Sequence, residues 1–178
     1  MPAVIRPYGD SDLDAVRSLF VRVNRELAPA HLAASFEDYI VRCLAEEIER
    51  IPAYYRERHG SFWVAADNSG IIGMFGIERV DAASAELRRM YVDPRARRSG
   101  LARHMLAFAE NLARREQCAV MMLSTSELQS AAISLYRSCG YRLVREAVAA
   151  QASNKTVGGG IRRFHFAKNL EPVMSANL

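Results

Sequence analysis

The chain has 178 residues, of which 50% are hydrophobic and 25% are charged, a composition typical of one globular domain large enough to hold its own core. It contains no run of roughly 18 apolar residues that could cross a membrane, and residues 1–10 lack the apolar stretch of a signal peptide. The net charge is +4. Because the cysteine count of three is odd and no signal peptide is seen, we expect reduced thiols and a cytoplasmic location, and because the cysteines lie at no metal-ligand spacing, we expect no metal site.

Capping signals and apolar spacing divide residues 1–60 into a strand and helices. Ser11 and Asp14 nearly match a capping box, and Ser35 precedes acidic residues that are favoured in a first helical turn. Pro52 breaks or restarts the second helix, because proline disfavours the helical conformation of the residue before it. We therefore expect a short strand and three helical segments, at 4–6, 13–27, 36–48 and 53–59.

A β-hairpin is predicted next. Residues 62–65 and 71–78 read as its two strands, and the sequence Asp-Asn-Ser-Gly at 67–70 is typical of the turn between them. Gly73 and Gly76 weaken the second strand, since glycine has no side chain to pack.

The central strand, residues 87–92, has an irregular apolar pattern. Leu87, Met90 and Val92 cannot all lie on one face under strict alternation. One extra residue near Arg88–Arg89, a β-bulge, would restore the pattern and leave backbone N–H groups unpaired. A strand buried on both faces is the alternative.

A basic turn and an amphipathic helix follow the central strand. Pro94 ends the strand because it cannot donate to the ladder, and the turn then runs through Arg97, Arg98 and Gly100. Apolar residues recur at helical spacing over 101–112. The first N–H groups of a helix have no internal partner and lie at the positive end of its dipole, so the turn is a predicted anion site that suits a pyrophosphate.

The distribution of basic residues argues for a small phosphate ligand. Lysine occurs only at Lys155 and Lys168, and arginines concentrate in the turn. A nucleic-acid surface would instead carry basic residues along an extended face. We therefore expect no nucleic-acid partner.

The C-terminal part is predicted to add a buried strand, a helix and an antiparallel pair of strands. Ser126 and Gln129 form a complete capping box for the helix, which ends at Gly140. Three consecutive glycines loosen the loop before the last strand. We expect strands at 119–123, 141–146 and 161–167, a loop at 147–160, a single domain over 1–168 and a C-terminal tail over 169–178.

Two segments resemble the GNAT family of N-acetyltransferases. The run Val92-Asp93-Pro94, followed by Arg97-Arg98-Ser99-Gly100-Leu101-Ala102, fills the family's Arg/Gln-x-x-Gly-x-Gly/Ala acyl-CoA loop after a strand ending Val-x-Pro. Residues 129–141 are similar to the family's Asn-x-x-Ala-x-x-Leu-Tyr-x-x-x-Gly-Phe segment, with Gln129 for the usual Asn and Tyr141 for the usual Phe. The resemblance covers roughly residues 61–166, whereas residues 1–60 match it only coarsely.

The resemblance implies a three-layer α/β sandwich with a mixed, mostly antiparallel sheet. Its two central parallel strands, 87–92 and 119–123, would splay to admit a pantetheine arm. The implied activity is acetyl transfer from acetyl-CoA to a primary amine by direct attack in a ternary complex, without a metal. A small amine or amino acid is the favoured acceptor, bound by residues 24–55 and 147–160. The alternatives are a protein or peptide N-acetyltransferase and a non-catalytic acyl-CoA-binding regulatory domain, and a homodimer is left open.

Two catalytic residues follow from the resemblance. It places the Tyr136 hydroxyl near the sulfur of CoA, where it would protonate or hydrogen-bond the departing thiolate, and a core tyrosine is the alternative. Glu86 is the candidate base, acting through water, because it precedes Arg97 at an offset similar to that of the family's catalytic glutamate. The alternatives are a salt bridge between Glu86 and Arg88, Glu78 as the base, or a water chain to solvent.

The other site residues are those that the resemblance assigns to acetyl-CoA. The backbone of the central strand would contact acetyl-pantetheine, and the start of the following helix would hold the pyrophosphate. Arg95, Arg97 and Arg98 are candidates for the 3′-phosphate, while the amide of Gln129 reaches one methylene further than the usual Asn. The predicted cofactor-binding residues are Met90, Tyr91, Val92, Arg97, Arg98, Ser99, Gly100, Leu101, Ala102, Arg103, Gln129 and Tyr136.

Overall fold

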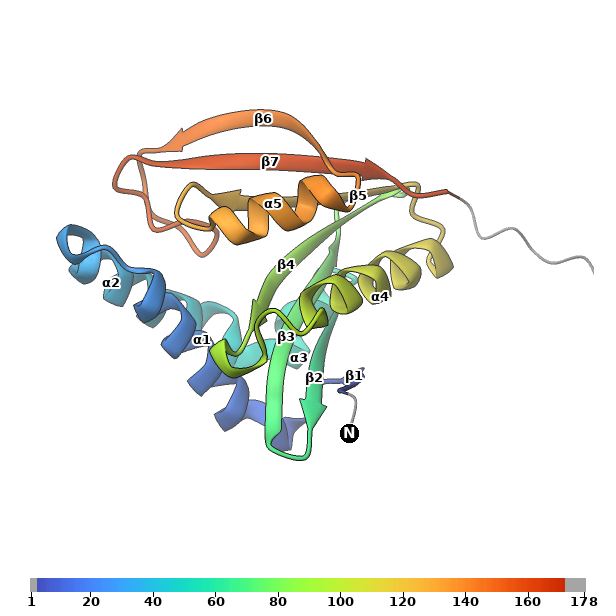
Figure 1. The fold of residues 1–178 in the computed structure, drawn as a ribbon, viewed down its shortest axis with the longest axis horizontal. Coiled ribbons are helices and arrows are strands. Elements are labelled where there is room, and N and C mark those ends of the chain that lie inside the picture. The colour runs from blue at the N-terminus through green and yellow to red at the C-terminus, as the bar shows by residue number, and fades with distance from the viewer. Residues whose placement is uncertain (1–2, 172–178) are drawn as a thin grey trace, which may run out of the picture.

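The computed structural model describes residues 3–171 as a seven-stranded sheet in the order β1-β2-β3-β4-β5-β7-β6, with helices on both faces (Figure 1). Adjacent strands are antiparallel except for β4 and β5, which are parallel. The strands are β1 Val4–Pro7, β2 Ser61–Asp67, β3 Gly70–Arg79, β4 Ser84–Val92, β5 Val120–Ser126, β6 Arg142–Ala149 and β7 Ile161–Asn169. The helices are α1 Leu13–Leu27, α2 Ala33–Glu46, α3 Ile51–Glu57, α4 Leu101–Arg115 and α5 Ser130–Ser138.

Two apolar clusters lie on opposite faces of the sheet. One contains the buried stripe of α4 and residues of α5, and the other contains the buried stripes of α1, α2 and α3. Adjacent residues of β2 are divided between them: Ala65 belongs to the first cluster and Val64 to the second, as strand alternation requires. The predicted three-layer sandwich is therefore confirmed (Figure 1).

The two parallel strands part beyond their first residues. The register pairs Ser84–Leu87 of β4 with Val120–Leu123 of β5, but β4 continues to Val92 and β5 to Ser126 without pairing to each other. β5 stays paired with β7 over this length. The predicted splay is confirmed, and it opens the sheet in its middle (Figure 1).

A β-bulge in β4 lies where the sequence predicts one. Arg88 pairs with Gly76 and Tyr91 with Met74, so two residues of β4 face one residue of β3. Arg89 has φ +53, an unusual value for a residue with a side chain. The bulge reading is confirmed, and the reading of a regular strand buried on both faces is wrong.

Several predicted boundaries differ from the structure. Helix α2 begins at Ala33, so Ser35 lies inside the helix and is not its cap. The box at Ser126 and Gln129 does not open α5, because Ser126 ends β5 and α5 starts at Ser130. β6 runs three residues further than expected, to Ala149. β7 reaches Asn169 and Leu170 is buried, so the fold extends two residues into the expected tail, of which 172–178 lie outside the described residues.

No helix within residues 3–171 combines the length and the apolar character that crossing a bilayer requires.

Candidate active site

A groove of about 570 Å³ lies at the splayed end of the sheet. Its walls come from the C-terminal ends of α1 and β4, the basic turn, the start of α4, and α5. All predicted cofactor-binding residues except Ser99 line it. The structure thus brings together two segments, 90–103 and 129–136, that are separated in the sequence by α4 and β5.

The groove ends at the N-terminus of α4, where the turn exposes backbone donors. Gly100 caps the helix with φ +85, a left-handed conformation that glycine adopts without strain. The Ser99 hydroxyl donates to the carbonyl of Ala96 at 2.7 Å, which holds the turn and keeps Ser99 out of the groove wall. The first N–H groups of α4, including those of Ala102 and Arg103, have no helical acceptor. This helix start is therefore suited to an anion.

The arginines of the turn differ in their partners. Arg95 binds Asp93, and Arg97 binds Glu26 through two hydrogen bonds of 2.6 and 2.7 Å. Arg98 lies within 4.0 Å of no carboxylate in residues 3–171. Of the three candidates for the 3′-phosphate, Arg98 is the one whose charge is not already balanced.

Tyr136 lies between the groove and a second, polar cavity, and it lines both. The residue is 5% exposed and packs against the rings of Tyr141 and Phe166, with centroids 5.9 and 6.1 Å away. Burial raises the pKa of Tyr136 above its usual value, because the low-dielectric surroundings disfavour the phenolate. The hydroxyl is therefore a proton donor to an anion and stays neutral at physiological pH.

Gln129 also lines both cavities, but its side chain turns back to the end of β5. Its Oε1 accepts from the Thr125 hydroxyl at 3.0 Å and from the Ser126 N–H at 3.4 Å. One hydrogen bond of the predicted capping box, from the Ser126 N–H to Gln129, is thus present. It links the end of β5 to the start of α5 and does not cap the helix.

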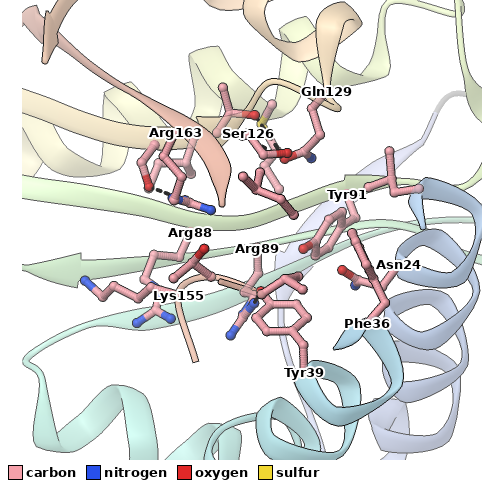
Figure 2. A pocket seen from close by; sticks show the side chains of 18 of the residues that line it. Asn24, Phe36, Tyr39, Arg88, Arg89, Tyr91, Ser126, Gln129, Lys155 and Arg163 are labelled. Carbon is pink, nitrogen blue, oxygen red and sulfur yellow. Dashed lines mark hydrogen bonds between the residues drawn. The ribbon is translucent and has the colours of Figure 1, made fainter. Parts of the chain in front are cut away.

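The polar cavity, about 90 Å³, lies on the α1–α2 side of the splay (Figure 2). Glu86 lines it, with 19% of its side chain exposed, and forms a 2.6 Å ion pair with Lys155 from the β6–β7 connection. Glu86 therefore has a salt bridge, but with Lys155 and not with the expected Arg88. Glu78 does not line this cavity; it is 6% exposed and pairs with Arg88. Of the two candidate bases, only Glu86 faces the space where an acceptor could lie.

A buried ion cluster that was not predicted from the sequence lies behind this cavity. Glu47, with a side-chain exposure of 0%, binds Arg88 at 3.1 Å and Arg89 at 2.7 Å. Arg89 also donates to the Tyr39 hydroxyl and to the backbone carbonyl of Asn154, both at 2.6 Å. Consecutive strand residues normally point to opposite faces, so the bulge is what lets both arginines reach one carboxylate.

Burial of Glu47 tends to raise its pKa, but the charges and hydrogen bonds of Arg89 and Arg88 outweigh burial and lower the pKa below its usual value. The cluster fixes the backbone of β4 next to the groove, and it ties the loop at Asn154 to the same point. Two adjacent arginines inside an otherwise apolar strand are the sequence signal that could have indicated it.

Comparisons with known proteins agree with this geometry. The family model described as "Acetyltransferase (GNAT) family" matches residues 20–141. The chain is 35% identical over 99 residues to Probable N-acetyltransferase 14 of Xenopus tropicalis, which covers 54% of this chain and 48% of that protein. It is 34% identical over 110 residues to N-acetylaspartate synthetase of Danio rerio, with coverages of 61% and 39%. The chain spans about half the length of the curated relatives it matches.

A solved structure shows the same fold. The putative acetyltransferase from Salmonella typhimurium with its cofactor acetyl-CoA superposes with a TM-score of 0.72 at 17% identity, over 99% of both chains. The family match reaches from α1 to Tyr141 and therefore includes the bulged strand, the basic turn, α4 and α5. The resemblance seen in the sequence is confirmed, and the chain belongs to the GNAT family of acetyltransferases.

Proposed function

We propose that the chain transfers an acetyl group from acetyl-CoA to the primary amine of a small acceptor, with an amino acid favoured, by direct attack in a ternary complex. One observation carries this proposal. The groove and the polar cavity share part of their lining, including Met90, Tyr91, Gln129 and Tyr136. A thioester lying in the groove would therefore present its carbonyl carbon to an amine lying in the cavity.

Different parts of the groove would bind different parts of acetyl-CoA. The open N–H groups at the start of α4 would bind the diphosphate, and Arg98 would bind the 3′-phosphate. The end of β4, over Met90 to Val92, would pair with the amide groups of the pantetheine arm. The splay supports this assignment because β5 does not occupy the pairing edge of β4 there.

The acceptor amine has to lose its charge before it attacks, since an ammonium has no lone pair. Glu86 would take this proton through a water in the polar cavity, and Lys155 would hold the carboxylate in place. The nitrogen then forms a bond to the thioester carbon. The register gives Arg89 and Met90 of the bulge no partner in β3, so backbone N–H groups there could donate to the oxygen as it gains charge.

The C–S bond breaks in the last step, and the sulfur leaves as a thiolate. The attacking nitrogen loses its second proton to water, so that the product is a neutral amide. Tyr136 would donate to it. A CoA thiol, with a pKa of about 8.5, holds its proton less tightly than a buried phenol, so hydrogen bonding supplies most of the effect. No step requires a covalent intermediate on the protein.

The acceptor class is supported by the cavity and by one relative. A cavity of about 90 Å³ encloses a small amine but leaves little room for a folded protein segment. The Danio rerio relative is named N-acetylaspartate synthetase, and that name describes acetylation of an amino acid. The alternatives, a protein or peptide acceptor and a regulatory acyl-CoA-binding domain, predict different substrates or no turnover.

The test is release of CoA thiol from acetyl-CoA in the presence of single amines: amino acids, polyamines, and peptides with a free N-terminus or lysine. Amine-dependent release with small acceptors supports the proposal. Release only with peptides would favour the protein-directed alternative. CoA binding without amine-dependent release by any of them would favour the regulatory domain and contradict the proposal.

A further inference from the structure

The charges around the polar cavity do not balance. Its lining contains one carboxylate, Glu86, which is paired with Lys155. The guanidinium groups of Arg88 and Arg89 are neutralised by Glu47 and Glu78, which lie behind the wall. One positive lining residue remains, and it is Arg163.

Arg163 extends from β7 into the cavity (Figure 2). Its one side-chain hydrogen bond within residues 3–171 is from Nη2 to the Ser124 hydroxyl, at 2.6 Å, and no carboxylate there lies within 4.0 Å. A guanidinium has five N–H donors in a planar fork that matches a carboxylate, so most of its donors remain available. Burial lowers the pKa of Arg163 below its usual value, although Tyr39, Tyr91 and Glu86 partly oppose this.

A partly buried cation without a counter-charge is costly to maintain, and an anionic ligand would remove the cost. Resting on the acetyl transfer proposed above, we propose that Arg163 binds the carboxylate of the acceptor, which is therefore a free α-amino acid and not a simple amine. Its amine would then lie in the same cavity, beside the groove that would hold the thioester.

Asn24 offers a hydrogen-bond acceptor for the amine of the amino acid. Asn24 is 3% exposed and lines the cavity, and its Nδ2 donates to the backbone carbonyl of Phe20 at 2.8 Å. This bond directs the amide so that Oδ1, which accepts no hydrogen bond from residues 3–171, is available to an acceptor N–H. The carboxylate and amine of one ligand would thus meet a cation and an acceptor, respectively.

The size of the cavity agrees with such a ligand. One water needs about 10–15 Å³ of cavity volume, so about 90 Å³ holds roughly six to nine waters. That number is comparable with the non-hydrogen atoms of a small amino acid.

The experiment compares each common L-amino acid with its primary amide, which keeps the amine and replaces the carboxylate by a neutral group. With the unaltered protein, we expect the KM of thiol release to be about 10- to 100-fold higher for the amide, the range expected for losing a charged hydrogen bond. Arg163→Gln should raise the KM for the amino acid by a similar factor, leave kcat within a few-fold, and abolish the preference over the amide. Amides accepted as well as amino acids, or a preference that survives in Arg163→Gln, would overturn the proposal while leaving acetyl transfer intact.

Arg162→Gln is the matched control. Arg162 is the preceding residue of β7, is exposed, pairs with Glu146 and points to the opposite face of the sheet. Its loss should leave the KM and the amide preference unchanged, and thermal unfolding should show that both variants fold.

A binding measurement covers the case in which no amine is acetylated. Each L-amino acid is titrated calorimetrically into protein saturated with CoA. Binding that disappears in Arg163→Gln would support the carboxylate site even though catalysis had failed. Absence of binding for every amino acid, with CoA still bound, would overturn it.

Discussion

Removing the charge of Glu47 perturbs the buried cluster with little change in shape. Glu47→Gln keeps the volume of the side chain and its hydrogen bond with the Tyr55 hydroxyl. It leaves Arg88 with Glu78 as its carboxylate partner and leaves Arg89 with no carboxylate partner among residues 3–171. Arg88 and Arg89 are 7% and 8% exposed, so water cannot solvate the guanidinium groups in place of the lost carboxylate.

The expected loss of stability is large. Removing one partner of a buried ion pair costs about 3–5 kcal/mol, because the other charge is left uncompensated. In a chain of this length, each kcal/mol lowers the midpoint of thermal unfolding by roughly 2–4 °C, so we expect Glu47→Gln to unfold about 6–20 °C below the unaltered protein at neutral pH.

The stability that Glu47 contributes depends on pH. The pKa of Glu47 is lowered in the folded state, so its contribution is fully present above the unfolded pKa of about 4.3 and is lost as the pH falls through the folded value. The difference in unfolding temperature between Glu47→Gln and the unaltered protein should therefore be constant near neutral pH and become smaller below about pH 4.

Circular dichroism during heating, repeated at several pH values, measures both effects. Glu37→Gln is the control, since Glu37 forms an equally close pair with Arg25 on the exposed surface, where ion pairs contribute little. Two results would refute a stabilising role for the buried cluster. One is that Glu47→Gln unfolds at the same temperature as Glu37→Gln, and the other is that the difference in unfolding temperature between Glu47→Gln and the unaltered protein stays the same when the pH falls below about 4.

Three further predictions concern the reaction. Tyr136→Phe should lower kcat by about 10- to 1,000-fold, and a loss under about twofold would remove the residue from the mechanism. Glu86→Gln should lower kcat/KM by about 10- to 100-fold with little change in stability, whereas Glu78→Gln should mainly lower stability; the reverse pattern would make Glu78 the base. Arg98→Gln should weaken CoA, but not dephospho-CoA, in a salt-dependent manner, and equal weakening of both would exclude a 3′-phosphate contact.

The middle of the chain could be predicted from the sequence because its signals are local. The spacing of Leu87, Met90 and Val92 indicated the bulge, and the run from Pro94 to Gly100 indicated a turn before a helix. Turn residues and strand alternation act over a few residues, so neither depends on the rest of the fold.

The polar cavity could not be predicted in the same way, because its residues meet only after folding. Arg163 of β7 and Lys155 of the loop before it line the same cavity as Glu86, and Glu47, the residue that follows α2, reaches Arg88. Nothing in the local sequence distinguishes Glu47, Lys155 and Arg163 from solvated charges, and only the adjacent arginines of β4 gave a local signal. The capping box at Gln129 failed for a related reason: its pattern is present, but Ser126 is held in β5 by its pairing with Arg163.

The proposed acetyl transfer requires that the start of α4 bind the diphosphate of CoA, and Ala102→Asp tests this most directly. Ala102 lines the groove in the first turn of α4, where an added carboxylate favours the helix but repels a diphosphate. By calorimetry, the unaltered protein should bind CoA, and Ala102→Asp should bind it at least about 10-fold more weakly while unfolding at the same or a slightly higher temperature. Equal affinity in the two proteins, or no binding of millimolar CoA to either, would contradict the account.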